Sequence, residues 1–130
     1  MAFNPGNPSQ LASVGYDNTV RLWDLTSGFT LTSIIEERQQ KVERDSQVNA
    51  MSWKPPGVYP ATETLLCVAS VAGSVKIVDA KRGKIISRIH LTSSTVFETD
   101  WNVHGIVACS ENCSLYFMKY MQDDEGKDDL

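Results

Sequence analysis

The sequence predicts an all-β fold in which a small antiparallel sheet is repeated about three times along the chain. Three observations carry this prediction: a hairpin pattern that occurs three times, a strand-like segment before each hairpin, and a further strand-like segment after the first two hairpins. Strands that follow one another in this way form an antiparallel meander. Each complete unit is therefore predicted to be a four-stranded antiparallel sheet.

The hairpin pattern is LASVGYDNTVRLWDL at 11–25, LCVASVAGSVKIVDA at 66–80 and IVACSENCSLYFMKY at 106–120. Each copy alternates between apolar and small or polar residues, breaks at a short turn, and then alternates again. Trp23, Val78 and Met118 occupy the same position in the three copies and are 55 and 40 residues apart. A period of about 40 residues is typical of four-stranded repeat units.

The flanking segments complete the units. The preceding strands are AFNP, VNAMSWKP and VFETDWNV, and the following strands are FTLTSII and KIISRIH. The predicted units are 1–35, whose innermost strand is short, then 48–90, and finally 91–121, which is partial.

Three segments depart from this spacing. A highly charged insert occupies 36–47, and a loop with three prolines interrupts the second unit at 55–64. The tail at 122–130 is polar and acidic, and we expect it to be disordered.

The pattern resembles the WD-repeat (WD40) family of β-propellers, over roughly residues 1–120. The best match is LASVGYDNTVRLWDLTSG in the first unit. The second unit has Val78 in place of the family's tryptophan and Ala72 in place of its turn aspartate, and the third has Asn112 at that aspartate. No unit carries the Gly-His pair that usually precedes a blade.

The resemblance implies a propeller fragment of about three blades, because closed propellers use roughly four to eight. The remaining blades are expected to come from a full-length chain or from a partner. Alone, the chain is expected to associate through its uncovered apolar faces.

The opening hairpin contains a structural motif. Asp17 is expected to accept backbone N–H bonds and hold its turn. Trp23 is large enough to fill the wedge between neighbouring blades. The Trp23–Asp24 pair closes this hairpin, and Asp79 is the counterpart of Asp24 in the second unit.

The resemblance also implies a function, that of a non-enzymatic protein–protein interaction scaffold within a multiprotein complex. The positions that the family uses for binding on the narrow face are the residues before the turns and two residues early in each innermost strand. In this chain they are Tyr16, Val71 and Glu111, then Gln47, Asn49, Thr95 and Phe97. Tyr16 and Phe97 stand out because aromatic residues dominate interface energetics. A core position is the alternative for Phe97.

Two other functions stay open. The third unit is somewhat similar to repeats of the transducin-β-like corepressor scaffolds, which would place the chain in chromatin complexes; a cytoskeletal, trafficking or ciliary assembly is the rival setting. A basic cluster within 76–88 offers a nucleic-acid-binding alternative, although it lacks interleaved aromatic residues. Its members are Lys76, Lys81, Arg82, Lys84 and Arg88.

Charge and motifs argue against other classes. The net charge is −4, and the last ten residues hold five acids and one lysine, so the other 120 residues are neutral. A protein body without net positive charge does not attract the phosphates of nucleic acid strongly. None of the common nucleotide-binding or hydrolase motifs occurs, so we predict no enzyme activity and no cofactor.

The cysteines and the apolar segments bear on three further questions: a metal site, a membrane span and the cellular compartment. Cys109 and Cys113 with His90 or His104 form a weak zinc pattern, for which core packing of the cysteines is the preferred alternative, so no metal is predicted. The longest nearly apolar run, at 65–73, is far shorter than the roughly 18 residues of a membrane span. An odd number of cysteines without a secretory signal indicates the cytoplasm or the nucleus.

Overall fold

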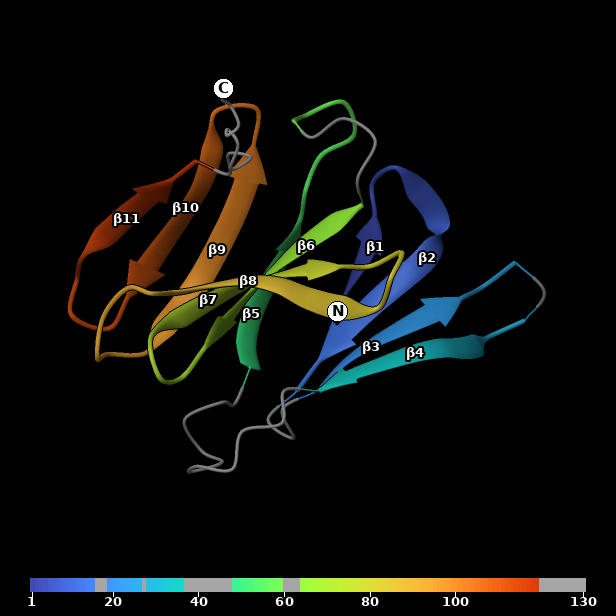
Figure 1. Cartoon of the computed structure of the whole chain (residues 1–130), viewed down its shortest axis with the longest axis horizontal. Helices are drawn as coiled ribbons and strands as arrows, with labels where there is room; N and C mark the ends of the chain where they lie inside the picture. Colours follow the sequence, from blue (N-terminus) through green and yellow to red (C-terminus); the bar gives the residue numbers. More distant parts are fainter. Residues whose placement is uncertain (16–18, 27, 37–47, 60–63, 120–130) are drawn as a thin grey trace, which may run out of the picture.

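A computed structural model of the chain describes residues 1–15, 19–26, 28–36, 48–59 and 64–119. These residues form eleven β-strands in three antiparallel sheets, and they include no helix (Figure 1). No helix in this part of the chain is therefore long and apolar enough to cross a membrane. The predicted all-β fold of about three antiparallel sheets is confirmed.

The first sheet is a meander in which each strand pairs with the next one along the chain. Its strands are β1 (Ala2–Asn4), β2 (Asn7–Val14), β3 (Thr19–Asp24) and β4 (Thr30–Glu36). The three-residue β1 is the shortest strand of the molecule among those described.

The second sheet repeats this order, and the third sheet has one strand fewer. The second consists of β5 (Val48–Trp53), β6 (Leu65–Ser70), β7 (Ser74–Asp79) and β8 (Lys84–His90). The third consists of β9 (Val96–Asn102), β10 (Gly105–Ser110) and β11 (Leu115–Met118). Of the insert predicted at 36–47, Glu36 ends β4 and the remainder lies outside the described residues, as does the tail predicted at 122–130.

The three sheets fan out side by side, with the second between the other two (Figure 1). Their innermost strands β1, β5 and β9 lie next to one another. The indole Nε1 of Trp53 donates across the first gap to the Ala2 carbonyl oxygen at 3.0 Å. Across the second gap, the hydroxyl oxygens of Ser52 and Thr99 are 3.2 Å apart.

The core is divided into two apolar clusters, one in each gap between sheets. The cluster between the first and second sheets contains the buried residues Ala12, Val20, Leu22, Ile35, Val48, Trp53, Leu66, Val68, Val78 and Ala80. The cluster between the second and third sheets contains Ala50, Leu65, Cys67, Ala69, Val75, Ile77, Val96, Trp101, Ile106 and Ala108.

Burial along the strands follows from this arrangement. All six residues of β6 are buried, because the second sheet is covered on both faces. In β11, by contrast, exposed and half-buried residues alternate, because only one face of the third sheet has a neighbour among the described residues. The order of the sheets along the chain thus decides which strands become continuous apolar runs.

Candidate functional site

One end of the second and third sheets forms a surface of three chain segments, which we call the rim. It consists of the turn 71–73 between β6 and β7, the connection 91–95 between β8 and β9, and the turn 111–113 between β10 and β11. The rim residues therefore connect six strand ends of two different sheets.

Hydrogen bonds join the three rim segments directly. The Thr95 hydroxyl donates to the Val71 carbonyl oxygen at 3.0 Å. The amide of Glu111 donates to the Thr95 carbonyl oxygen at 2.8 Å. Three of the predicted binding residues are thus brought into one connected group by backbone and side-chain bonds.

Gly73 is the point of closest approach within the rim. Its φ is +92°, and a Cβ atom there would lie 1.8 Å from the carbonyl oxygen of Thr92. Its own carbonyl oxygen accepts the amide of Leu91 at 2.9 Å. Only glycine fits this geometry, so the turn 71–73 and the connection 91–95 are held in tight contact.

Phe97 is the large apolar side chain next to the rim, and it is 54% exposed. It sits in a β-bulge, because Ser110 pairs with Val96 whereas Cys109 pairs with Glu98. A bulge re-aims a side chain, and here Phe97 points outward although Val96 beside it is fully buried. The alternative of a core position for Phe97 is thereby wrong.

The second sheet carries a bulge at the same place. Val48 pairs with Ser70 and Ala50 pairs with Ala69, so Asn49 is the extra residue of β5. Asn49 and Phe97 are therefore equivalent positions of adjacent innermost strands, although the side chain of Asn49 lies outside what the structure describes. Both were candidates from the sequence.

The other predicted binding residues divide into two groups. Val71 and Thr95 are half-buried in the rim, and Glu111 is exposed there. Tyr16 and Gln47 lie outside the described residues.

A polar network that the binding-site prediction did not include supports the turn 111–113. Asn112 Oδ1 accepts the Ser114 amide at 3.2 Å and the Ser110 hydroxyl, and Asn112 Nδ2 donates to Thr92 Oγ1 at 3.4 Å. Hydrogen bonds with Thr92, and then with Asn112, lower the pKa of the Tyr116 phenol. Turn-forming asparagine is the sequence signal that could have identified this network.

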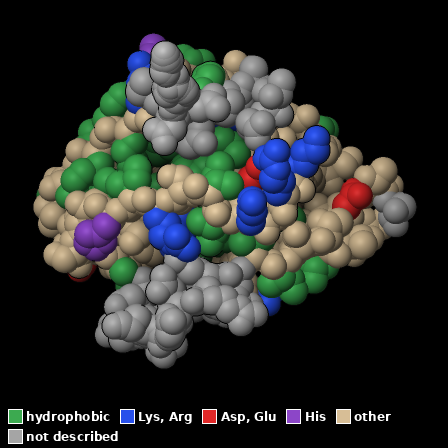
Figure 2. Space-filling view, viewed as in Figure 1, with side chains coloured by type: hydrophobic (Ala, Val, Ile, Leu, Met, Phe, Trp, Pro, Cys, Tyr) green, Lys and Arg blue, Asp and Glu red, His purple; other side chains and the backbone are tan. Residues whose placement is uncertain are grey.

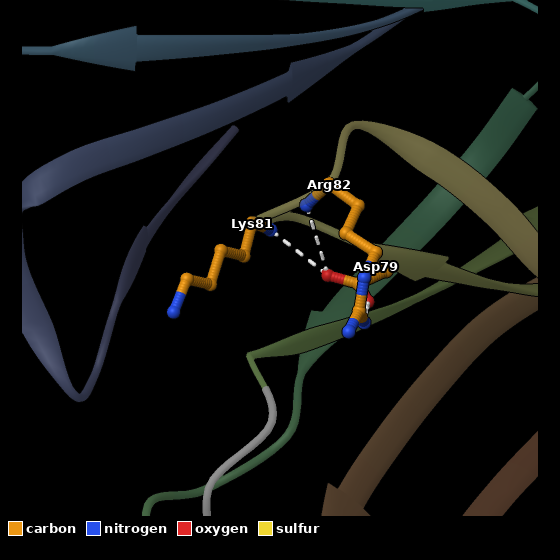
Figure 3. A network of polar contacts seen from close by, with 3 residues as sticks. All are labelled: Asp79, Lys81 and Arg82. Atoms are coloured by element: carbon orange, nitrogen blue, oxygen red, sulfur yellow. Dashed lines mark hydrogen bonds and ion pairs between the residues drawn. The ribbon is translucent and has the colours of Figure 1, made fainter.

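The β7–β8 hairpin is held by a buried carboxylate (Figure 3). Asp79 is 1% exposed, and its Oδ1 accepts the amides of Lys81 and Arg82 at 3.0 and 3.1 Å. Its Oδ2 lies 2.6 Å from Nη1 of Arg82. Burial raises the pKa of Asp79, but these hydrogen bonds outweigh it and leave the pKa below its usual value.

The corresponding residues of the first sheet are arranged differently. Asp24 accepts the hydroxyl and, at 2.9 Å, the amide of Thr26, and these two bonds lower its pKa. Trp23 is half-buried, donates from Nε1 to Ser13 Oγ at 3.1 Å, and stacks on Phe29 with ring centroids 4.9 Å apart. Asp17 lies outside the described residues.

The basic cluster is not fully exposed to solvent. Lys76 is buried, and the Arg82 guanidinium is paired with Asp79. Lys81, Lys84 and Arg88 are exposed, and Lys and Arg side chains appear over the β7–β8 hairpin in Figure 2. The burial of Lys76 and the ion pair of Arg82 reduce the positive charge that this cluster offers to phosphate groups.

The cysteines are free, and they differ in exposure. Within the described residues, no group of three His, Cys, Asp or Glu side chains could hold a metal ion. Cys67 is buried, and burial raises the pKa of its thiol to about 12. Cys109 and Cys113 are exposed, so the expectation that these two pack in the core is wrong.

An apolar pocket of about 150 Å³ opens between the second and third sheets. It is lined by Val75, Ile77, Ser87, Ile89, Ile106, Met118 and Lys119. Ile35 and Ile89 occupy equivalent positions, opposite Val20 and Val75, yet they are 6% and 43% exposed. The difference arises because Ile35 faces the four-stranded second sheet, whereas Ile89 faces the third sheet, in which no described strand follows β11. The pocket can accept a small apolar group.

Comparisons with known proteins agree with the repeated four-stranded pattern. The family model described as "Anaphase-promoting complex subunit 4 WD40 domain" matches residues 37–104, just over half of the chain. The model described as "WD domain, G-beta repeat" matches residues 1–24. No curated protein matches the chain.

Two solved structures share the arrangement of sheets. Sqt1 of Saccharomyces cerevisiae has a TM-score of 0.68 at 16% sequence identity, over 85% of this chain and 28% of that one. The computationally designed Ika4 protein has a TM-score of 0.66 at 15% identity, over 85% of this chain and 60% of that one. The chain thus spans less than two thirds of either structure, and at these identities the likeness shows the fold.

The fold and the rim define a partial β-propeller built from sequential antiparallel blades. The chain belongs to the WD40-repeat family. This family consists generally of non-enzymatic scaffolds for protein–protein interaction, and its members bind protein partners. The recognition made from the sequence is confirmed.

Proposed function

We propose that this chain is a non-enzymatic docking subunit of a multiprotein assembly, and that it binds a partner segment at the rim next to Phe97. The observation that carries the proposal is the exposed Phe97, which a β-bulge turns outward beside three hydrogen-bonded loops. A rigid aromatic anchor in such a setting is the usual centre of a binding hot spot.

The charges near Phe97 favour one kind of partner. Glu98 follows it in β9, and Glu111 is bonded through its amide to Thr95, two residues before Phe97. Both acids are exposed. A partner segment with an apolar side chain next to a lysine or arginine would complement this surface in shape and charge.

The family match supports a particular kind of assembly. The model that covers 37–104 is named for a subunit of the anaphase-promoting complex, so we assign this chain to a large complex of that kind. The corepressor alternative is supported only by the similarity of this chain's third unit to repeats of the transducin-β-like corepressor scaffolds. The nucleic-acid alternative is weakened by the burial of Lys76 and the pairing of Arg82. Three free thiols are compatible with the cytoplasm or the nucleus.

Affinity purification of the tagged chain from its own cells, followed by quantitative mass spectrometry, tests this proposal. Phe97→Glu should reduce recovery of anaphase-promoting complex subunits at least tenfold, because it places a charge in the anchor position. Val103→Glu is the matched control, since Val103 is 71% exposed on the turn between β9 and β10, away from the rim. Absence of these subunits from the wild-type sample, or equal loss in both variants, would refute the proposal.

A further inference from the structure

The two gaps between the sheets are built in the same way. We call the face that a sheet turns toward the next sheet along the chain its forward face, and the opposite face its backward face. In the first gap the forward face of the first sheet contributes Val20 and Leu22, which pack with Trp53, Leu66 and Val78 from the backward face of the second sheet.

The second gap repeats this contact at equivalent positions. Val75 and Ile77 of the second sheet occupy the places of Val20 and Leu22, and they pack with residues of the third sheet. On the backward faces, the paired row Trp53–Leu66–Val78 in the second sheet corresponds to Trp101–Ile106–Met118 in the third. Each contact therefore joins a forward face to a backward face.

Among the described residues, one face of each kind has no neighbouring sheet. The first is the backward face of the first sheet, where the equivalent row is Phe3–Leu11–Trp23–Leu31. In this row Phe3 is 55% and Leu31 is 40% exposed. Phe29 stacks on Trp23 beside it.

The second uncovered face is the forward face of the third sheet. Phe117 and Leu115 are 60% and 73% exposed there, opposite Val107 and Cys109 of β10. The two uncovered faces are thus the two halves of an interface that the molecule already forms twice.

We infer that two copies of this chain bind head to tail, with the forward face of the third sheet of one copy on the backward face of the first sheet of the other. The contact continues the established interface between sheets, and it pairs opposite charges. Glu98 and Asp100 lie on the forward face, paired with Cys109 and Val107, whereas Arg21 lies on the backward face, two residues from Trp23.

We take this head-to-tail contact to close into a dimer. A head-to-tail contact produces a ring when its rotation closes and an open filament when it does not. The described sheets of two copies number six, which lies within the range of roughly four to eight blades in closed propellers. This inference does not rest on the partner proposed for the rim, although Glu98 borders both surfaces.

Sedimentation of the full chain over a concentration series, with one variant for each face, tests the inference. The wild type should sediment at twice the monomer mass of 14.4 kDa. Phe117→Glu and Leu31→Glu should each reduce the mass twofold, while Val103→Glu leaves it unchanged. All three side chains are exposed, so circular dichroism should show that the variants remain folded.

Mixing the two variants separates this arrangement from a symmetric one. Phe117→Glu keeps an intact backward face and Leu31→Glu keeps an intact forward face, so the equimolar mixture should recover a one-to-one dimer. That dimer should be weaker than the wild type, because one contact holds it instead of two. A contact between two identical faces would be abolished by one variant alone and would not be restored in this way.

Thiol labelling gives a second measurement that does not depend on the variants. Cys109 lies on the forward face, whereas Cys113 lies in the turn 111–113, and both are exposed in the single chain. The labelling rate of Cys109 should fall at least tenfold as the dimer forms, while that of Cys113 stays constant. A monomer at all concentrations, open species larger than a dimer, or failure of the variant mixture to associate would each overturn the inference.

Discussion

Asp79 shows how a single residue fixes a local structure. Its carboxylate is buried and accepts two backbone amides at the start of the β7–β8 turn. The Arg82 side chain that completes the group is 62% exposed, so solvent screens its charge. The backbone amides therefore contribute more to the hairpin than the ion pair does.

The lowered pKa of Asp79 predicts how the stability of the fold depends on pH. Because its pKa is lowered in the folded chain, the ionised carboxylate stabilises the fold above its usual pKa of 3.8, and this contribution disappears as the pH falls through the lower folded value. Asp79→Asn should cost about 1–3 kcal/mol at pH 7, and the difference from wild type should shrink below about pH 4. Urea unfolding followed by tryptophan fluorescence at pH 7 and pH 3 measures both quantities. Arg82→Ala should cost no more than about 1 kcal/mol at pH 7, and a larger loss would contradict this assignment.

Cys67 predicts a difference in reactivity among the three thiols. Its pKa is raised to about 12, so almost no thiolate is present at pH 8, and the side chain is also buried. In a dilute folded sample, a disulfide reagent should label Cys109 and Cys113 rapidly, and it should label Cys67 only after unfolding. Rapid reaction of all three thiols without denaturant would show that the core between the second and third sheets is open.

At the scale of the elements, the gaps between sheets are filled by large side chains from the innermost strands. Trp53 and Trp101 occupy equivalent positions in β5 and β9, and both are buried. Trp23, in the first sheet, lies on a face that no described sheet covers. The same residue type thus has two different roles, which depend on whether a neighbouring sheet is present.

Substitution of Trp101 and of Trp23 by alanine should reduce the free energy of unfolding by different amounts. Trp101→Ala should reduce the free energy of unfolding by about 3–5 kcal/mol, because it leaves a cavity between two sheets. Trp23→Ala should cost about 1–2 kcal/mol, since the ring is half-buried and loses one hydrogen bond and one stacking partner. Denaturant unfolding at a concentration where the chain is monomeric compares the two. Equal costs would mean that Trp23 is covered by a sheet in solution.

The strands and turns could be predicted from the sequence. Which sheet faces are covered by a neighbouring sheet could not. Alternation at Val20 and Leu22 marks a strand wherever it lies, whereas the neighbour of Trp23 depends on residues far away in the chain. The bulge at Phe97 could not be predicted, because it is visible only in the pairing and burial of the folded strand. Val96 and Thr99 are both buried although three residues apart, which regular alternation in a strand does not allow.

The candidate site was partly predictable for a similar reason. The positions of Val71, Thr95 and Glu111 followed from the family pattern, and the structure joins them by hydrogen bonds. The exposure of Phe97 and the close approach at Gly73 depend on how the strands pair across the sheet. Both features bring together residues that are not adjacent in the sequence.

At the scale of the whole molecule, the described residues form a row of three sheets, in which the second has a neighbouring sheet on both faces and the outer two each have one on a single face. The rim lies on the second and third sheets, where hydrogen bonds join its three segments. The rim can therefore present a preformed surface, which limits the entropy lost on binding.

Hydrogen–deuterium exchange of the chain, free and within its purified assembly, tests the central claim most directly, because it locates the bound partner without any substitution. The account predicts that amide exchange slows at 71–73, 91–97 and 111–113 on assembly, while the loop at 55–59 and the β7–β8 turn at 80–83 exchange at unchanged rates. Slower exchange confined to the β7–β8 turn, with the rim unchanged, would contradict it.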